Sequence, residues 1–255
     1  MKLEIILRTH DQSNIHTDRE RYCNLSKKEL ILGCLTSLVN SANLVENYEI
    51  NFKILDDHSS SELIQGIYNI FDKSKCPYEL YHLKESGFHY SGLKQFEFGK
   101  NSEADLVYMV EDDYLHCPSA LTEMLDCYNL FVEKTGQEIA IYPFDMPDDY
   151  VPPWMVPSYV VHGSKRHWRT GHWTTFTMMV RPQLIEKHWE IFELLGSQYN
   201  GASVNEGNTI CEIWKNHALR FSPIQSLALH MQFDTQVDPY IDWETWWKEY
   251  TELKA

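Results

Sequence analysis

Short apolar runs alternate with helix-like segments through the N-terminal half of the chain, and this alternation restricts the possible folds more than any other feature. Two capping boxes mark helix starts, because in each a serine precedes a glutamate by three residues: Ser26 with Glu29, and Ser59 with Glu62. The runs with strand character cover residues 3–9, 52–55, 78–83 and 106–110. Strands that alternate with helices form βαβ units, so we expect an α/β fold with a mostly parallel central sheet flanked by helices.

The C-terminal half has a less regular pattern. Residues 145–157 hold four prolines and are expected to form a long loop, and residues 162–172 are expected to form a basic, histidine-rich loop between two strands. Those two strands and three later helices are expected at residues 158–161, 173–180, 182–195, 209–217 and from Asp242 onward. No internal repeat or clear linker interrupts the chain, so the sequence predicts one domain over residues 1–255 with an irregular C-terminal region.

Polar clusters directly follow three of the predicted strands. They are Arg8-Thr9-His10, Asp56-Asp57-His58 and Glu111-Asp112-Asp113. Because ligands bind beyond the carboxyl ends of parallel strands, we expect these clusters to form one site. Neighbouring carboxylates repel one another unless a cation neutralises them, and such oxygens suit Mg²⁺ or Mn²⁺, which keep positions open for substrate phosphates. The third cluster also permits a simpler interpretation, a solvated acidic turn before a helix that starts near Pro118.

The overall charge restricts the partners of the protein. The 255 residues include 22 Lys and Arg against 37 Asp and Glu, which gives a formal net charge of −15 at pH 7. This surplus argues against binding nucleic acid, and it means that a phosphate-bearing substrate would need a metal ion or a local basic cluster. The six cysteines form no CxxC pair, and no apolar stretch approaches the roughly 20 residues of a membrane span. We therefore expect a cytoplasmic protein with at most peripheral membrane contact.

The order of these motifs resembles that of the nucleotide-sugar-dependent glycosyltransferases of the GT-A fold, especially the large inverting group typified by family 2. In that group a first strand leads into a nucleotide-contacting segment, as at residues 5–10, and a second ends in Asp followed by small residues, as at 54–60. A later apolar strand ends in a DxD metal motif, as at 110–113, although Glu111 here replaces the first Asp. The resemblance extends over residues 3–230.

The resemblance implies a GT-A-like, Rossmann-like fold with a nucleotide-sugar-binding half, residues 1–117, and an acceptor-binding half, residues 118–255. The implied nucleotide contacts are Arg8, Thr9, Asp56, Asp57 and Asp112. The implied metal ligands are Asp113, Glu111 and His230, which would hold Mn²⁺ or Mg²⁺ on the donor diphosphate. The implied reaction moves a sugar from a UDP- or dTDP-sugar to a hydroxyl of a glycan or glycolipid, with inversion, in glycan or surface polysaccharide biosynthesis.

Two further segments contribute candidate residues on the acceptor side. Residues 204–207 resemble the acidic motif that supplies the catalytic base at a helix start, although the usual Glu-Asp pair is absent. Glu206 is the candidate base and Glu212 a weaker one, and an ordinary helix-entry carboxylate is the alternative for Glu206. In the basic loop 162–172, Arg166 and Arg169 would neutralise the leaving diphosphate. The alternative for that loop is a hairpin tip that balances nearby acidic residues.

Two other functions stay open at this point. A nucleotidyltransferase acting on sugar phosphates also combines an α/β sheet with metal-binding carboxylates, but residues 10–14 are not the Gly-rich basic loop expected after its first strand. A non-catalytic carbohydrate-binding protein would use the ring faces of Trp154, Trp168 and Trp173. The sequence contains no GxxxxGK[ST] phosphate loop, no GxGxxG motif and no GxSxG nucleophile motif.

Overall fold

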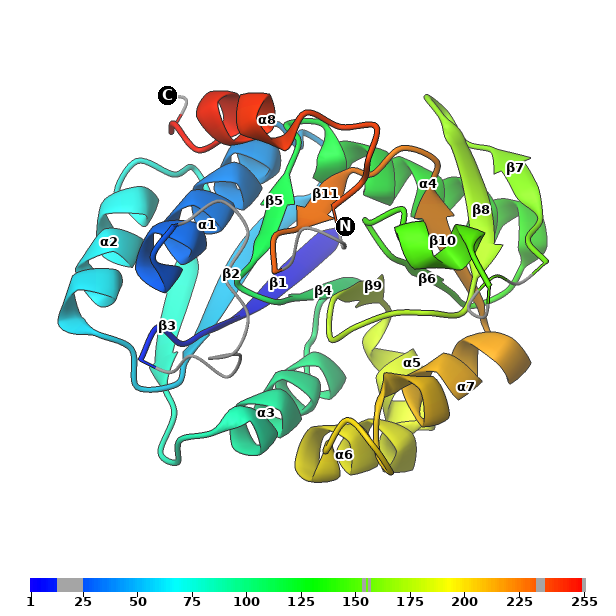
Figure 1. Ribbon diagram of the computed structural model, residues 1–255, viewed down its shortest axis with the longest axis horizontal. Helices are drawn as coiled ribbons and strands as arrows, with labels where there is room; N and C mark the ends of the chain where they lie inside the picture. The colour runs from blue at the N-terminus through cyan, green and yellow to red at the C-terminus, as the bar shows by residue number, and fades with distance from the viewer. Residues whose placement is uncertain (13–24, 153–154, 156, 233–236, 254–255) are drawn as a thin grey trace.

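The computed structural model describes residues 1–12, 25–152, 155, 157–232 and 237–253, and a nine-stranded sheet crosses the centre of this part of the chain (Figure 1). The strand order is β3-β2-β1-β4-β9-β6-β10-β8-β7. The strands are β1 (Lys2–Thr9), β2 (Glu49–Asp56), β3 (Tyr78–His82), β4 (Leu106–Val110), β6 (Ile139–Ile141), β7 (Val160–His162), β8 (His167–Gly171), β9 (Met178–Val180) and β10 (Leu219–Pro223). Within this sheet all strands except β9 and β8 run in one direction. The predicted α/β fold with a mostly parallel sheet is confirmed.

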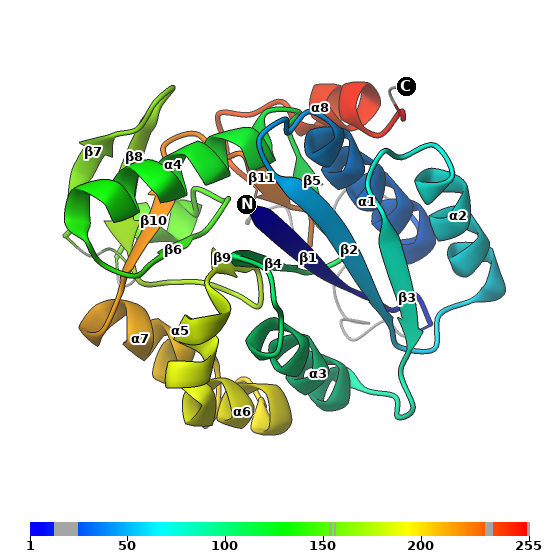
Figure 2. The ribbon, with the colours of Figure 1, turned by 180° about the vertical axis from the view of Figure 1, so that it is seen from behind.

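Helices cover both faces of the sheet (Figures 1 and 2). One face carries α1 (Lys27–Asn43), α2 (Ser61–Phe71) and α4 (Ala120–Thr135), with α8 (Trp243–Tyr250) packed against α1. The other face carries α3 (Phe88–Lys100), α5 (Pro182–Lys187), α6 (Trp189–Gln198) and α7 (Ile210–Asn216). Across the described ranges, no helix has the length and apolar character needed to cross a membrane.

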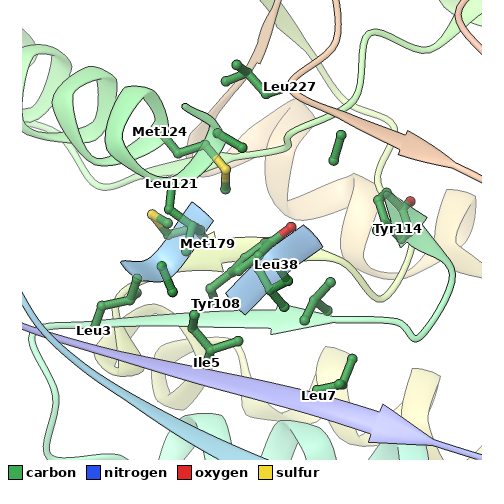
Figure 3. Packing of buried hydrophobic residues seen from close by; sticks show 14 of the residues in the cluster. Leu3, Ile5, Leu7, Leu38, Tyr108, Tyr114, Leu121, Met124, Met179 and Leu227 are labelled. Atoms are coloured by element: carbon green, nitrogen blue, oxygen red, sulfur yellow. The ribbon is translucent and has the colours of Figure 1, made fainter. Parts of the chain in front are cut away.

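Alternation of side chains along the central strands divides the core into two layers. Leu3, Ile5 and Leu7 of β1 pack in the cluster beneath α1 and α4, as Figure 3 shows, whereas Ile6 packs in the cluster on the opposite face. All four side chains are at most 2% exposed. Because successive side chains of a strand point to opposite faces, a strand with helices on both sides buries nearly every side chain and is mostly apolar. Two charged residues of β1, Glu4 and Arg8, are also buried, and each faces an opposite charge, Lys53 and Glu111 respectively.

A second, two-stranded sheet lies beside the first and brings distant segments together. β5 (Tyr114–His116) begins directly after Asp113, and it pairs antiparallel with β11 (Ala228–His230). The register sets His230 opposite Tyr114, so two residues more than a hundred positions apart become neighbours. The sequence analysis does not predict β5 or β11, because three-residue strands leave too short a periodic pattern to recognise.

Several local predictions need correction. The second helix is capped by Ser60 rather than Ser59, since the Ser60 hydroxyl accepts a hydrogen bond from the backbone N–H of Leu63 at 3.2 Å. The predicted strand 173–180 is reduced to β9, and the predicted helix 182–195 is divided into α5 and α6 at His188. The predicted loop 162–172 is mostly strand, because β8 pairs with both β7 and β10, which satisfies its backbone hydrogen-bonding groups.

Candidate functional site

The three polar strand ends meet at one edge of the sheet, as the sequence predicts. In the parallel registers, Thr9 of β1 lies opposite Asp56 of β2, and Leu7 lies opposite Val110 of β4. The segments after the strands are also joined, because the backbone N–H of Asp57 donates to the carbonyl of Thr9 at 2.9 Å. The polar residues that end β1, β2 and β4 therefore lie together at the carboxyl edge of the sheet.

A cavity of about 650 Å³ opens at this edge. Its wall combines two chemically distinct sets of side chains. The titratable set consists of Lys27, His89, Glu111, Asp113, Glu206 and His230. The aromatic set consists of Phe88, Trp173, Phe176 and Tyr199. A cavity with a mostly apolar wall and a few converging charged groups is the usual form of a small-molecule site.

Asp113 and His230 form the charged pair closest to the small sheet. The Nε2 atom of His230 lies 3.4 Å from Oδ1 of Asp113, and the backbone N–H of Met231 donates to the Asp113 carbonyl at 2.8 Å. The imidazole is stacked on the ring of Tyr114, with 4.7 Å between ring centroids and 12° between planes. Burial alone would lower the pKa of His230, but the nearby carboxylates of Asp113, Glu111 and Glu206 raise it. This pair thus sets an imidazole directly beside a carboxylate in the cavity wall.

Glu111 is held in place by contacts with Arg8 and Thr177. Its Oε1 lies 3.5 Å from Nη2 of Arg8, and its backbone N–H donates to the hydroxyl of Thr177 at 3.1 Å. Burial and the charge of Asp113 raise the pKa of Glu111, while Arg8 acts in the opposite direction. The Arg8 guanidinium lies over the rings of Phe88 and Phe176, 5.1 and 4.7 Å from their centroids. Arg8 is absent from the cavity lining, so in this geometry it is a counter-ion behind the acidic cluster.

The other predicted nucleotide contacts lie behind the cavity wall. The backbone N–H of Ser59 donates to Oδ1 of Asp56 at 3.1 Å, and the backbone N–H of Gly87 donates to Oδ2 of Asp57 at 3.0 Å. Thr9 is buried at the end of β1, with 1% of its surface exposed. In these positions Asp56 and Asp57 fix the loops that follow β2 and precede α3.

Asp112 contacts both Lys27, in the cavity wall, and the backbone that follows β1. Its Oδ2 lies 3.8 Å from Nζ of Lys27, which lines the cavity, and accepts a hydrogen bond from the backbone N–H of His10 at 3.1 Å. Burial raises the pKa of Asp112, and the Lys27 ammonium opposes that rise. Asp112 therefore ties the start of α1 to the edge of β1, which sets Lys27 at the cavity.

Glu206 reaches the cavity from a short 3₁₀ turn, η3 (Glu206–Asn208). The turn is capped by Asn205, whose side chain accepts a hydrogen bond from the backbone N–H of Asn208 at 3.2 Å. Burial and, secondarily, the charge of Glu111 raise the pKa of Glu206 to about 7. Glu212 differs, since it forms an exposed ion pair with Lys215 at 2.7 Å and is absent from the cavity lining. The structure thus distinguishes the two candidate bases.

The predicted contact of the basic loop with a diphosphate is not supported by the position of its arginines. Nε of Arg166 lies 2.6 Å from a carboxylate oxygen of Glu123, and neither Arg166 nor Arg169 lines the cavity. Arg169 is buried, and its guanidinium lies 2.9 Å from Asp145 and 2.8 Å from Asp149. These arginines neutralise internal carboxylates, which agrees with the alternative interpretation of a hairpin that balances nearby acid.

The structure describes two of the three tryptophans considered for carbohydrate contact, and they lie in different environments. Trp168 is buried in the core with 1% of its surface exposed, whereas Trp173 lines the cavity. Trp154 lies outside the described residues. The aromatic wall formed by Phe88, Phe176 and Tyr199 is missed by sequence analysis, because its members come from three separate segments without a shared motif.

The donor chemistry of the cavity is compatible with a divalent metal. Among the side chains that the structure describes, no group of three His, Cys, Asp or Glu residues is arranged to hold a metal ion. Asp113 and His230 nevertheless offer a carboxylate and an imidazole to the same space, and Mn²⁺ or Mg²⁺ commonly completes its coordination with substrate phosphates and water. Two protein donors therefore fit a metal that arrives with a phosphate-bearing ligand.

Comparison with known proteins identifies the fold. No family model matches the chain, and no curated protein matches it. The crystal structure of S. aureus TarS matches with a TM-score of 0.55 and 14% identity, over 89% of this chain and 36% of the TarS chain. A TarS 1-349 structure matches with a TM-score of 0.54 and 14% identity, over 87% of this chain and 60% of that chain. The chain spans less than two thirds of either TarS chain. The likeness confirms the predicted GT-A-like fold.

Proposed function

We propose that this chain transfers a sugar from a nucleoside diphosphate donor, a UDP- or dTDP-sugar, to an acceptor hydroxyl. The observation that carries the proposal is that Asp113, His230 and Glu206 line one cavity at the carboxyl edge of a GT-A-like sheet. A fold alone does not determine a function, so the proposal depends on these side chains and their charges.

The Asp113 end of the cavity is the proposed diphosphate site. Asp113 and His230 are the residues that would hold Mn²⁺ or Mg²⁺, and Glu111 lines the same cavity. When bound, such a metal offsets the negative charge that develops on the leaving diphosphate. Lys27, which also lines the cavity, contributes positive charge there. These groups explain how an acidic protein with a net charge of −15 would tolerate an anionic donor.

Glu206 is the proposed general base. Its pKa of about 7 means that near neutral pH a substantial fraction is ionised and able to take a proton, which is the range in which a general base works best. Glu206 would accept the proton of the acceptor hydroxyl while the hydroxyl oxygen bonds to the anomeric carbon. The bond from that carbon to the diphosphate oxygen breaks on the opposite side, so the product would have inverted configuration.

Turnover of nucleotide sugars by the purified chain tests this proposal. Release of nucleoside diphosphate from a panel of UDP-, dTDP- and GDP-sugars is measured with Mn²⁺, with Mg²⁺ and with a chelator. We expect metal-stimulated release that falls at least a hundredfold in Asp113→Asn and in Glu206→Gln, while Glu212→Gln, an exposed carboxylate outside the cavity, retains wild-type rates. Absence of turnover with every donor, or equal rates in all variants, would overturn it.

A further inference from the structure

The environment of Trp173 differs from that of every other tryptophan in the described residues. Trp168, Trp189 and Trp214 pack in or against the two main hydrophobic clusters, and those of α8 pack against the cluster beneath that helix. Trp173 belongs to none of these clusters; it is half-buried and lines the cavity. A large apolar ring held at a cavity wall rather than in a core is typical of ligand contact.

The turn that carries Glu206 is shaped around this ring. A Cβ atom added to Gly207 would lie 2.9 Å from Cη2 and Cζ3 of Trp173, closer than such contacts normally allow. A glycine at this position therefore permits the indole edge to lie directly against the backbone that follows Glu206. The ring and the candidate base are thus adjacent, on the same side of the cavity.

The indole also has polar neighbours. The ring of His172 lies 5.3 Å from it between centroids, with 41° between planes. Nζ of Lys215 lies 6.0 Å from the ring centroid, at the outer limit of a cation–π contact, and this lysine is already paired with Glu212. Tyr199 and Asn200 also line the cavity with Trp173 and Glu206. This combination of an aromatic face, an amide and a carboxylate matches a pyranose ring, which has apolar C–H faces and a rim of hydroxyl groups.

We propose that Trp173 is the stacking platform for the pyranose ring of the acceptor, which makes the acceptor a saccharide rather than a protein or small alcohol hydroxyl. The inference rests on the proposed function, because it assigns the acceptor side of the same cavity. Stacking on Trp173 holds one ring hydroxyl toward Glu206. Its energy is needed for transfer to a sugar but not for hydrolysis, in which water replaces the acceptor.

The first measurement compares transfer with hydrolysis. Formation of disaccharide from methyl glucoside, methyl galactoside and methyl N-acetylglucosaminide is followed by mass spectrometry, alongside release of free sugar from the donor. Trp173→Ala is expected to lower kcat/KM for the methyl pyranosides at least tenfold more than it lowers donor hydrolysis, and Trp173→Phe is expected to retain most transfer. Trp189→Ala removes a half-buried tryptophan outside the cavity, and it is expected to change neither rate.

The second measurement detects binding without turnover. In protein labelled with 5-fluorotryptophan, the fluorine resonance missing from Trp173→Phe is assigned to Trp173, and it is expected to shift on addition of the methyl pyranosides while that of Trp189 does not. Equal loss of transfer and hydrolysis in Trp173→Ala, unchanged transfer, or a static resonance would overturn the inference. If the wild type turns over no donor but the Trp173 resonance shifts, the transferase proposal fails and the saccharide site stands.

Discussion

Replacement of Glu206 by glutamine is expected to make the protein more stable and less active. Its pKa in the folded state is about 7, against an ordinary value of 4.5. Between these two values the unfolded chain ionises before the folded one, so the free energy of unfolding falls as the pH rises from 4.5 to 7 and is then constant. A pKa difference of one corresponds to about 1.4 kcal/mol, so the full loss is up to about 3 kcal/mol.

Glutamine has the same shape as glutamate but does not ionise, so Glu206→Gln is expected to avoid this loss. Urea unfolding in the presence of a chelator, measured at intervals from pH 4 to pH 8, should show equal stability of both proteins at pH 4. At pH 8 the variant should be more stable by up to about 3 kcal/mol. Glu212→Gln is the control, because Glu212 is exposed and its hydrogen bond with Lys215 lowers its pKa.

Activity should change in the opposite direction. Loss of a general base typically lowers the rate by 10²–10⁴-fold, so Glu206→Gln should lower transfer by about that factor. Wild-type transfer should rise with pH and level off above about 7. Parallel pH–stability curves for wild type and Glu206→Gln would refute the raised pKa of the Glu206 carboxyl, and undiminished transfer would refute its role as base.

Three further substitutions test the geometry of the site and its surroundings. Asp113→Asn should lower the pKa of the His230 imidazole, because the carboxylate 3.4 Å away is lost; an NMR titration in a chelator measures this, and an unchanged pKa contradicts the pairing. Arg169→Met should destabilise the fold by about 3–5 kcal/mol in urea unfolding, since it leaves the buried Asp145 without its guanidinium while Asp149 keeps that of Arg220 at 3.3 Å; wild-type stability would contradict that role. Arg166→Ala should leave donor turnover within about twofold, whereas a tenfold loss would indicate that Arg166 contacts the donor.

The sequence predicts the N-terminal half of the fold well because the signals there are local. Residues 5–7 and 106–110 are apolar at every position since both faces of these strands are buried, and the Ser26 capping box fixes the start of α1. Parallel strands end at the same edge of a sheet, so the polar clusters that follow β1, β2 and β4 are expected to lie together even when no side-chain contact is known. This part of the site follows from short-range patterns and one topological rule.

Other parts of the site depend on contacts that no local pattern encodes. A basic run such as residues 162–172 reads as a solvated or anion-binding loop, but Arg166 and Arg169 find their carboxylates on α4 and on the segment after β6. The aromatic wall of the cavity likewise requires α3 to pack beside the segment before β9, where Phe88 meets Phe176 with 5.1 Å between ring centroids. These contacts form only when distant segments pack together. The sequence pattern alone therefore does not indicate whether an arginine pairs with an internal carboxylate or contacts a ligand.

The most direct test of the account is the position of manganese and nucleotide in the folded protein. Crystals grown with Mn²⁺ and UDP are measured at a wavelength that gives an anomalous signal from manganese. The account predicts a peak within bonding distance of Asp113 and His230, with the diphosphate on the same ion and the nucleoside at the carboxyl edge of β1. Nucleotide bound away from this cavity, or a crystal that binds neither ion nor nucleotide at saturating concentrations, would contradict the claim that this cavity is a nucleotide-sugar site.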